Sequence, residues 1–372
     1  MIKRTLFIGW GNVVREYYWE HLRPYYENGT MLPVIAETPE KAGVIPGIAA
    51  PWGGREIDGL IKKGVFNRIF ILTPPSLHME QLRHCLGLLR DSRSSGTIYI
   101  EKPVDTNLRR ARSTVTWVRG LKRPASWSVR QIDHYAQKWC SRWIRAHQRQ
   151  VASLVGPIKE IVFISYETAL IDRSLSFKQG YAREHGTHAW AMINHCFPEL
   201  ADPRVHVQLA GAPSSWRYTD CPAVCMRESA FLITYRLQLP AGRSRLFGET
   251  VLVTIAAGKA LQREVKQLTI KGPRVGLTAF FNKDRINAIT ARGAAEIGRT
   301  QRDISKQPAY KTIIDAIYTE RNANAATSML EDGLLALERI EMAAKRFGKL
   351  RNHKKRTTPV ELARVVVDAG PS

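Results

Sequence analysis

The residues of this 372-residue chain that are best suited to chemistry lie in short turns after apolar segments. The first turn, Gly9-Trp10-Gly11-Asn12-Val13, follows Thr5–Ile8 and precedes a segment with helical spacing, Val14–Tyr26. Glycines at such a turn allow a pyrophosphate to approach the N-terminus of the following helix. Val14 stands where a third small residue usually lets the helix pack closely on the strand, so an ordinary strand-turn-helix unit also fits. We expect Gly9, Gly11, Asn12 and Val13 to bind a dinucleotide.

A carboxylate follows the second apolar segment, Met31–Ala36. Glu37 stands about 20 residues after the glycine turn, where a carboxylate accepts hydrogen bonds from a ribose diol. It would repel a 2′-phosphate, whereas Lys41 or Arg15 would attract one, and a solvated strand end is the plain alternative. The sequence therefore predicts NAD in preference to NADP.

Two further turns follow the apolar segments Arg68–Leu72 and Thr97–Ile100. The first is Thr73-Pro74-Pro75-Ser76-Leu77-His78, and the second is Glu101-Lys102-Pro103. If the segments are parallel strands, both turns lie at the carboxyl edge of the sheet, where open α/β sheets bind ligands. We therefore expect the two turns to contribute to one site.

This succession of turns resembles the glucose-fructose oxidoreductase / inositol dehydrogenase (Gfo/Idh/MocA) family, whose members have Thr-Pro-x-x-x-His and Glu-Lys-Pro turns after a Rossmann fingerprint. The resemblance extends over roughly residues 1–345. It implies an NAD(P)-dependent oxidoreductase in which Lys102 contacts the substrate near the reacting carbon. By itself, Lys102 is also compatible with a surface lysine. The resemblance adds Thr73, Pro74, His78 and Glu101 to the cofactor-binding residues.

A second resemblance concerns the substrate site. Residues 131–138, Gln-Ile-Asp-His-Tyr-Ala-Gln-Lys, are similar to the Arg-Ile-Asp-His-Tyr-Leu-Gly-Lys signature of glucose-6-phosphate dehydrogenases. Gly180-Tyr181, Gly186 and Asn194-His195 align without gaps with the segment that ends in that enzyme's catalytic histidine. The resemblance implies that His195 is the general base and that Asp133 orients it. The implied substrate-binding residues are Lys102, His134, Tyr135, Lys138, Tyr181 and Asn194.

A histidine suits this role because proton removal during hydride transfer needs a base whose pKa lies near the working pH. A structural histidine between Met192-Ile193 and Cys196-Phe197 is the alternative for His195. Gln131, Ala136, Gln137, Arg183 and Trp190 depart from the dehydrogenase pattern. The oxidoreductase family is thus better supported than glucose 6-phosphate as the substrate.

The elements that must position these residues have the pattern of two domains and a tail. Residues 1–125 alternate apolar segments with helical ones (Val14–Tyr26, Arg55–Lys63 and Leu77–Arg90), which predicts a doubly wound parallel Rossmann sheet. Residues 126–347 contain long β-rich segments after a helical stretch, His134–Leu154, and before another, Ala309–Phe347. They predict an α+β domain with a large, mainly antiparallel sheet. Residues 348–372 form a basic tail.

Composition restricts the partners. Lys and Arg number 56 against 33 Asp and Glu, a net charge of +23 that favours anionic ligands. Residues 109–150 hold eleven cations and one acid, and tryptophans interleave with them, which would also suit nucleic acid. Trp139 and Trp143 are four residues apart, however, as expected of the buried side of a helix. We therefore expect a small anionic substrate, with nucleic acid less favoured.

The five cysteines, Cys85, Cys140, Cys196, Cys221 and Cys225, show neither disulfide nor zinc spacing. His185, His188 and His195 add no common zinc pattern, so we expect no metal site. No apolar stretch approaches the roughly 20 residues that span a bilayer, and we read no signal peptide. The sequence predicts a cytoplasmic protein without a membrane association, and an exposed sheet face in the second domain would suit a homodimer or homotetramer.

Three functions remain open from the sequence. The first is hydride transfer between nicotinamide and the carbinol or carbonyl carbon of a sugar or cyclitol, phosphorylated or nucleotide-linked. The second is reduction of a C=N bond on the same fold. The third is a non-catalytic binding protein for nucleic acid or an acidic partner, which the concentrated charge and the missing third glycine would suit.

Overall fold

The computed structural model describes residues 3–37, 48–121, 126–167, 181–218, 230–240, 242, 246–258, 264–283, 285–290, 293–299, 307–320, 323–347 and 351–353. Lys41, Gly180, Cys221, Cys225 and most of the predicted basic tail lie outside these residues. Within the described part of the chain, no helix is both long and apolar enough to cross a membrane.

The chain divides into two compact units, each of which uses two stretches of sequence. The first unit comprises residues 1–137 and 306–337, and the second comprises 138–305 and 338–372. This division differs from the predicted boundary between residues 125 and 126. Strand β6 (Trp127–Ile132) continues the first sheet by pairing with β5, and a C-terminal segment returns to the first unit.

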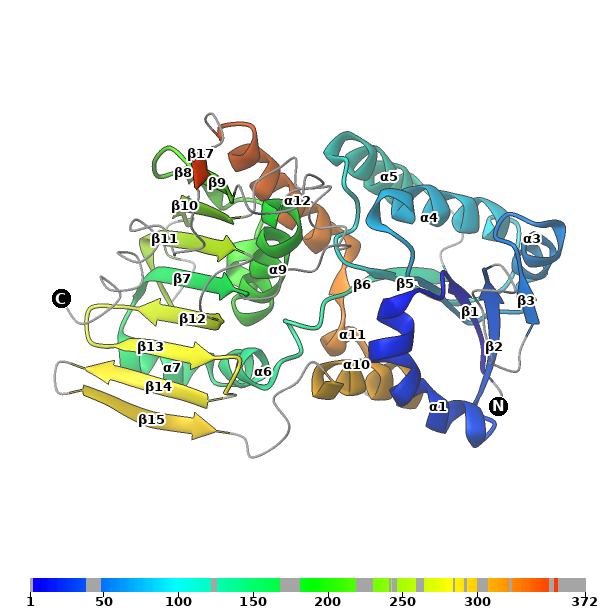
Figure 1. The fold of residues 1–372 in the computed structure, drawn as a ribbon, viewed down its shortest axis with the longest axis horizontal. Helices are drawn as coiled ribbons and strands as arrows, with labels where there is room; N and C mark the ends of the chain where they lie inside the picture. The colour runs from blue at the N-terminus through cyan, green and yellow to red at the C-terminus, as the bar shows by residue number, and fades with distance from the viewer. Residues whose placement is uncertain are drawn as a thin grey trace. The chain divides into compact units, whose positions relative to one another are not determined.

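The first unit is built on a seven-stranded sheet (Figure 1). Six of its strands run parallel, and a short strand, β16, pairs antiparallel with β6. In spatial order the strands are β3 (Ile48–Ala50), β2 (Met31–Ala36), β1 (Lys3–Ile8), β4 (Arg68–Ile71), β5 (Gly96–Glu101), β6 (Trp127–Ile132) and β16 (Ser328–Met329). The chain moves outward from β1 to β3 and then returns to β4, so the topological switch point lies between β1 and β4.

Helices cover both faces of this sheet, as a doubly wound fold requires. On one face, Leu6 and Ile8 join a core with α3 (Arg55–Lys62), α4 (Pro75–Leu89) and α5 (Leu108–Gly120). On the other face, Phe7 and Phe70 join a core with the helix after β1 and with α10 (Gln307–Thr319). Because both faces are buried, the strands are continuous apolar runs, which is why the sequence predicted them.

The helix after β1 differs from prediction in its opening turn. Val14–Tyr18 form a π-helical segment, η1, and Trp19–Glu27 continue as the α-helix α1. The Val14 side chain is fully buried between the helix and the sheet, at the position where a small residue is usual. A wider helical turn is one way to accommodate this bulk.

The second unit contains a ten-stranded sheet that is mainly antiparallel. Along its path the order is β15 (Gly293–Arg299), β14 (Arg285–Thr290), β13 (Gly276–Phe280), β12 (Val265–Lys271), β7 (Ile158–Tyr166), β11 (Phe247–Gly258), β10 (Ala230–Gln238), β9 (Ser214–Tyr218) and β17 (Arg351–His353), and β8 (His206–Leu209) pairs with β10. The pairs β7–β11 and β9–β17 are parallel. The predicted α/β plus α+β fold class is confirmed.

The prediction of a single helix over His134–Leu154 is wrong. Residues 134–137 form a turn, and α6 (Trp139–Ala146) and α7 (Gln148–Val155) follow, separated at His147. The stretch predicted as Ala309–Phe347 contains α10, α11 (Ala323–Ala326) and α12 (Leu330–Ala344). The second unit also contains η2 (Ala182–Gly186), α9 (Thr187–Cys196) and the short 3-10 helix η3 (Pro198–Ala201).

Candidate functional site

The glycine turn after β1 touches the Thr73 turn after β4, at the switch point of the first sheet. Gly9 has φ +89°, and a Cβ there would lie 2.7 Å from Thr73 Cγ2. Its N–H donates to the Ala36 carbonyl oxygen at the end of β2 (3.3 Å). Only glycine satisfies both the backbone conformation and the close approach. The ends of β1, β2 and β4 are thereby drawn together at the carboxyl edge of the sheet.

The remaining predicted dinucleotide residues of these turns are open to solvent. Gly11, Asn12 and Val13 are exposed, and a Cβ built on Gly11 would meet no atom within 4 Å. Glu37 is half-buried directly after β2. A backbone exposed at the start of a helix, with a carboxylate at the end of the next strand, fits the pyrophosphate and ribose of a dinucleotide.

Beneath these turns, His78 ties the two predicted motifs together. Nε2 lies 2.7 Å from the Thr73 carbonyl oxygen, and Nδ1 lies 2.9 Å from that of Pro103, which follows a cis peptide bond. The ring is fully buried, and this burial lowers the pKa of His78 to about 4, against the opposing effect of the two carbonyl contacts. His78 therefore holds the turns in place from below. Of the turn residues above it, Pro74 is exposed and Thr73 is half-buried.

Glu101 ends β5 as a buried carboxyl with three hydrogen-bond donors. The Tyr18 hydroxyl donates to Oε1 (3.0 Å), the Tyr310 hydroxyl donates to the same oxygen (3.3 Å), and the Lys102 N–H donates to Oε2 (2.8 Å). Burial raises the pKa of Glu101, while the Lys102 charge and the Tyr18 hydrogen bond oppose the rise. Lys102 itself is half-exposed on the turn.

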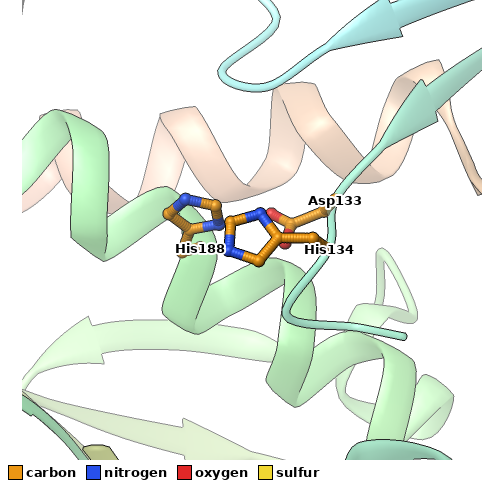
Figure 2. Close-up of side chains that lie close together, drawn as sticks. All are labelled: Asp133, His134 and His188. Atoms are coloured by element: carbon orange, nitrogen blue, oxygen red, sulfur yellow. The ribbon is translucent and has the colours of Figure 1, made fainter. Parts of the chain in front are cut away.

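The turn after β6 carries Asp133, His134 and Tyr135, all of which are buried. Figure 2 shows the side chains of Asp133 and His134 on this turn. The Tyr135 N–H donates to Asp133 Oδ1 (2.9 Å), and the Tyr135 ring lies 4.7 Å from the His134 ring. His134 also stacks on Tyr310, with 5.2 Å between ring centroids. In the first unit, the structure thus brings His134 and Glu101 together through Tyr310.

In the second unit, His195 lies on the last turn of α9 and is partly exposed. Its neighbour Asn194 is buried, and Asn194 Oδ1 accepts a hydrogen bond from Arg339 Nη1 (3.2 Å). Arg339 is itself buried on α12, donates to the Leu200 carbonyl oxygen (2.6 Å) and lies 4.1 Å from the centre of the Trp190 ring. Burial lowers the pKa of Arg339 to about 10, so it is a cation at neutral pH. The side-chain oxygen of Asn194 is therefore engaged by Arg339 at the end of α9.

The other predicted substrate residues of this unit are Tyr181 and Lys138. Tyr181 is buried and stacks on His185 (4.1 Å between ring centroids), at the start of η2. His185 Nδ1 lies 3.2 Å from Ser165 Oγ, and the His188 ring on α9 lies 5.7 Å from that of His185. Lys138 is half-buried at the N-terminus of α6. Lys102 and Asp133 belong to the first unit and His195 to the second.

The tryptophans and cysteines have structural contacts. Trp139 lies against the backbone of β15, where a Cβ on Gly298 would be 3.2 Å away, and Trp143 stacks on His147 (4.4 Å between ring centroids). Trp117 lies under the Arg83 guanidinium, 5.5 Å from it. The described cysteines, Cys85, Cys140 and Cys196, are buried free thiols, and burial raises the pKa of Cys196 to about 12. Trp139 and Trp143 are half-buried, whereas the buried residues of α6 are Cys140, Ser141 and Ile144, so the spacing of the two tryptophans did not mark the buried side of the helix.

Two residues of the site were missed by sequence reasoning. Tyr18 and Tyr310 lie 83 and 209 residues from Glu101, on helices whose apolar pattern makes each tyrosine look like a core residue. The one local signal is an acidic residue, Glu101, directly after the apolar segment Thr97–Ile100. A carboxyl that is drawn into a core requires hydrogen-bond donors from elsewhere in the chain.

No protein-family model matches the chain, and no curated protein sequence matches it. Solved structures do. A biliverdin reductase from Synechocystis, in complex with biliverdin and NADP+, is 14% identical with a TM-score of 0.63, covering 93% of this chain and 99% of that one. A myo-inositol dehydrogenase from Corynebacterium glutamicum is 15% identical with a TM-score of 0.63, covering 93% and 97%. The chain therefore shares the fold of these two structures, a parallel sheet followed by a larger, mainly antiparallel sheet.

A third structure widens the range of reactions found on this fold. It is a 3-ketoreductase from Actinomadura kijaniata in complex with NADP and TDP-benzene, 11% identical with a TM-score of 0.66, covering 96% of this chain and all of that one. Identities this low establish a shared fold. The resemblance to glucose-6-phosphate dehydrogenase in residues 131–138 stays a prediction.

Proposed function

We propose that this chain is an NAD(P)-dependent oxidoreductase that moves hydride between nicotinamide and the carbinol or carbonyl carbon of a sugar or cyclitol. The observation that carries the proposal is the contact of Gly9 with Thr73 at the switch point, with Gly11 open above it and Glu37 beside it. Folds of this kind bind dinucleotides at that crevice. The similar solved structures include oxidoreductases in complex with NADP.

The residues of the first unit fit a dinucleotide. Gly11, Asn12 and Val13 would take the pyrophosphate at the start of the helix, and Glu37 would accept hydrogen bonds from the ribose diol, which favours NAD. Thr73 and Glu101 would line the nicotinamide end, with His78 supporting both turns from beneath. When bound, the cofactor supplies the hydride or accepts it; the protein supplies orientation and the proton.

Three side chains of the chain carry the proposed chemistry. Lys102 would donate a hydrogen bond to the oxygen on the reacting carbon, and its charge would stabilise an alkoxide there. His195 would take the hydroxyl proton during oxidation or return it during reduction, with Asp133 orienting the imidazole. The proposal requires that Lys102 and His195 act on one substrate.

The substrate is proposed to be anionic. The net charge of +23 raises the local concentration of anions, and Lys138 and Tyr135 supply a cation and a hydroxyl suited to a phosphate. His134 supplies a ring nitrogen that can accept a hydrogen bond from a substrate hydroxyl. The similar solved structures include a myo-inositol dehydrogenase and a 3-ketoreductase in complex with TDP-benzene. These two proteins support a cyclitol or a nucleotide-linked sugar as the substrate class. A C=N substrate is the alternative on the same cofactor geometry.

Calorimetry with NAD(H) and NADP(H) tests the cofactor assignment. We expect binding that Gly11→Asp weakens, because the new carboxylate would repel the pyrophosphate, whereas Gly29→Asp, in an exposed turn with φ +72°, serves as the control. The absence of binding at roughly millimolar dinucleotide would overturn the proposal.

Turnover of sugar phosphates, nucleotide sugars, cyclitols and cyclic imines then tests the reaction. Lys102→Ala and His195→Ala should each lower kcat by about 10² while leaving dinucleotide affinity unchanged. If either variant retains full kcat on the best substrate, its assigned role is wrong.

A further inference from the structure

The buried tyrosines Tyr18 and Tyr310 converge on one oxygen of Glu101, at the carboxyl edge of the first sheet. Both hydroxyls donate to Oε1, at 3.0 and 3.3 Å, and the rings lie 5.0 Å apart. Burial and the Glu101 charge raise the pKa of each phenol well above its usual value, so both stay protonated. A carboxylate can only accept hydrogen bonds, which fixes the direction of these two bonds.

Tyr310 has a second polar neighbour, His134. The Tyr310 hydroxyl oxygen lies 3.4 Å from His134 Nδ1, and the two rings stack with 24° between their planes. Tyr17 stacks on Tyr310 as well, with 18° between the planes. The ring of Tyr310 is thus fixed by aromatic neighbours, and its hydroxyl stands between the turn after β5 and the turn after β6.

Counting donors assigns the proton on His134. Tyr310 has one hydroxyl proton, and it donates this proton in the hydrogen bond to Glu101 Oε1. The phenol oxygen can therefore only accept a hydrogen bond from His134. Nδ1 of a neutral His134 must then carry the ring proton, which leaves the lone pair on Nε2. Through this single hydroxyl, Glu101 contributes to the orientation and the tautomer of His134.

We propose that Tyr310 is a positioning residue that fixes the Lys102 turn through Glu101 and the tautomer of His134 through its own hydroxyl oxygen. This inference rests on the proposed function for its catalytic consequence, because Lys102 and His134 are there assigned to the substrate. The Lys102 N–H bonds the second oxygen of the same carboxyl (2.8 Å), so loosening Glu101 loosens the turn that presents the Lys102 side chain.

The same helix offers a matched control. Tyr318 lies on α10 as Tyr310 does, and it is buried. Its hydroxyl oxygen is hydrogen-bonded to Thr5 Oγ1, at a distance of 3.0 Å. Thr5 is near the start of β1, so Tyr318 is at the amino edge of the sheet, whereas Tyr310 is at the carboxyl edge with Glu101. Tyr310→Phe and Tyr318→Phe remove the same atom from opposite ends of one helix.

The test measures amide exchange, histidine tautomer and kinetics on the three variants Tyr310→Phe, Tyr318→Phe and Tyr18→Phe. Losing a hydrogen bond to a charged group should let the Lys102 amide exchange about tenfold faster in Tyr310→Phe and in Tyr18→Phe. Only Tyr310→Phe should move the His134 proton from Nδ1 toward Nε2, seen in 15N spectra. Tyr318→Phe should change neither measurement.

Kinetics add the catalytic consequence. Tyr310→Phe should lower kcat about tenfold with an unchanged dinucleotide Kd, and Tyr318→Phe should match the unmodified protein. The inference is overturned if Tyr310→Phe and Tyr318→Phe behave alike in exchange and tautomer. If the protein binds no dinucleotide, the proposed function fails, while exchange and tautomer still decide the role of Tyr310. Should Tyr310→Phe not fold, Tyr18→Phe tests the Lys102 turn alone, and unchanged exchange there would refute the link through Glu101.

Discussion

His78 should make the stability of the first unit depend on pH in a defined direction. In the folded protein, burial lowers its pKa from the ordinary 6.5 to about 4. The unfolded chain therefore binds more protons than the folded chain between these values, so stability falls as pH falls. The contribution is fully present above about pH 6.5 and is lost progressively toward about pH 4. A pKa difference of one corresponds to about 1.4 kcal/mol. The fall from 6.5 to about 4 therefore lowers the free energy of unfolding by about 3 kcal/mol at about pH 4.

His78→Gln isolates this contribution because an amide does not titrate yet still donates to one of the two carbonyl oxygens. We expect the variant to be less stable at neutral pH and to lose about 3 kcal/mol less than the unmodified protein on going to about pH 4. Urea unfolding at several pH values measures this difference, with hydrogen exchange of the β4 and β5 peptides assigning the transition to the first unit.

His84→Gln is the matched control. His84 also lies on α4, but it is partly exposed and pairs with Asp58 Oδ1 (2.8 Å). If His78→Gln and the unmodified protein lose the same unfolding free energy between neutral and acidic pH, then a buried neutral His78 is not the cause, and the two carbonyl contacts would have to hold a protonated ring.

Three further outcomes follow from single contacts. Gly9→Ala should destabilise the first unit by roughly 1–3 kcal/mol in urea unfolding, because its Cβ would meet Thr73 at φ +89°, whereas Gly29→Ala in open space should cost less; equal losses would contradict the packing explanation. Glu37→Ala should shift the ratio of NAD to NADP affinity about tenfold toward NADP in calorimetry, and an unchanged ratio would remove Glu37 from the ribose site. Arg339→Met should speed amide exchange at the last turn of α9 and lower kcat more than dinucleotide affinity, because it removes the hydrogen bond to Asn194. Unchanged, slow exchange there would show that this hydrogen bond does not hold the end of α9 in place.

The parallel sheet of the first unit was predictable because both of its faces are buried. Along β1, Leu6 and Ile8 enter one core and Phe7 enters the other, so every position is apolar and the strand is visible in the sequence. The turns after β1, β4 and β5 were equally visible, since their glycines, prolines and charged residues stand at the carboxyl end of each strand.

The roles of individual side chains were less predictable. The assignment of Asn194 to the substrate by resemblance stays a prediction, and the structure adds that its oxygen is bonded to Arg339, 145 residues away. His78 was expected at the cofactor, and it lies beneath the turns with no exposed surface. Tertiary packing brings Arg339 to Asn194 and Pro103 to His78, and no local pattern encodes these two partners, whereas the second partner of His78, Thr73, is only five residues away.

The return of α10 to the first unit shows how packing and function are coupled in this fold. The sheet face carrying Phe7, Ile35 and Phe70 needs more cover than η1 and α1 provide, and α10 shares that core. A helix laid along parallel strands has one end at each edge of the sheet. Tyr318 consequently reaches Thr5 at the amino edge, and Tyr310 reaches Glu101 at the carboxyl edge, where ligands bind. The helix that completes the core therefore also brings a hydroxyl to the candidate site, and exchanging the two tyrosines for phenylalanine separates these two contributions.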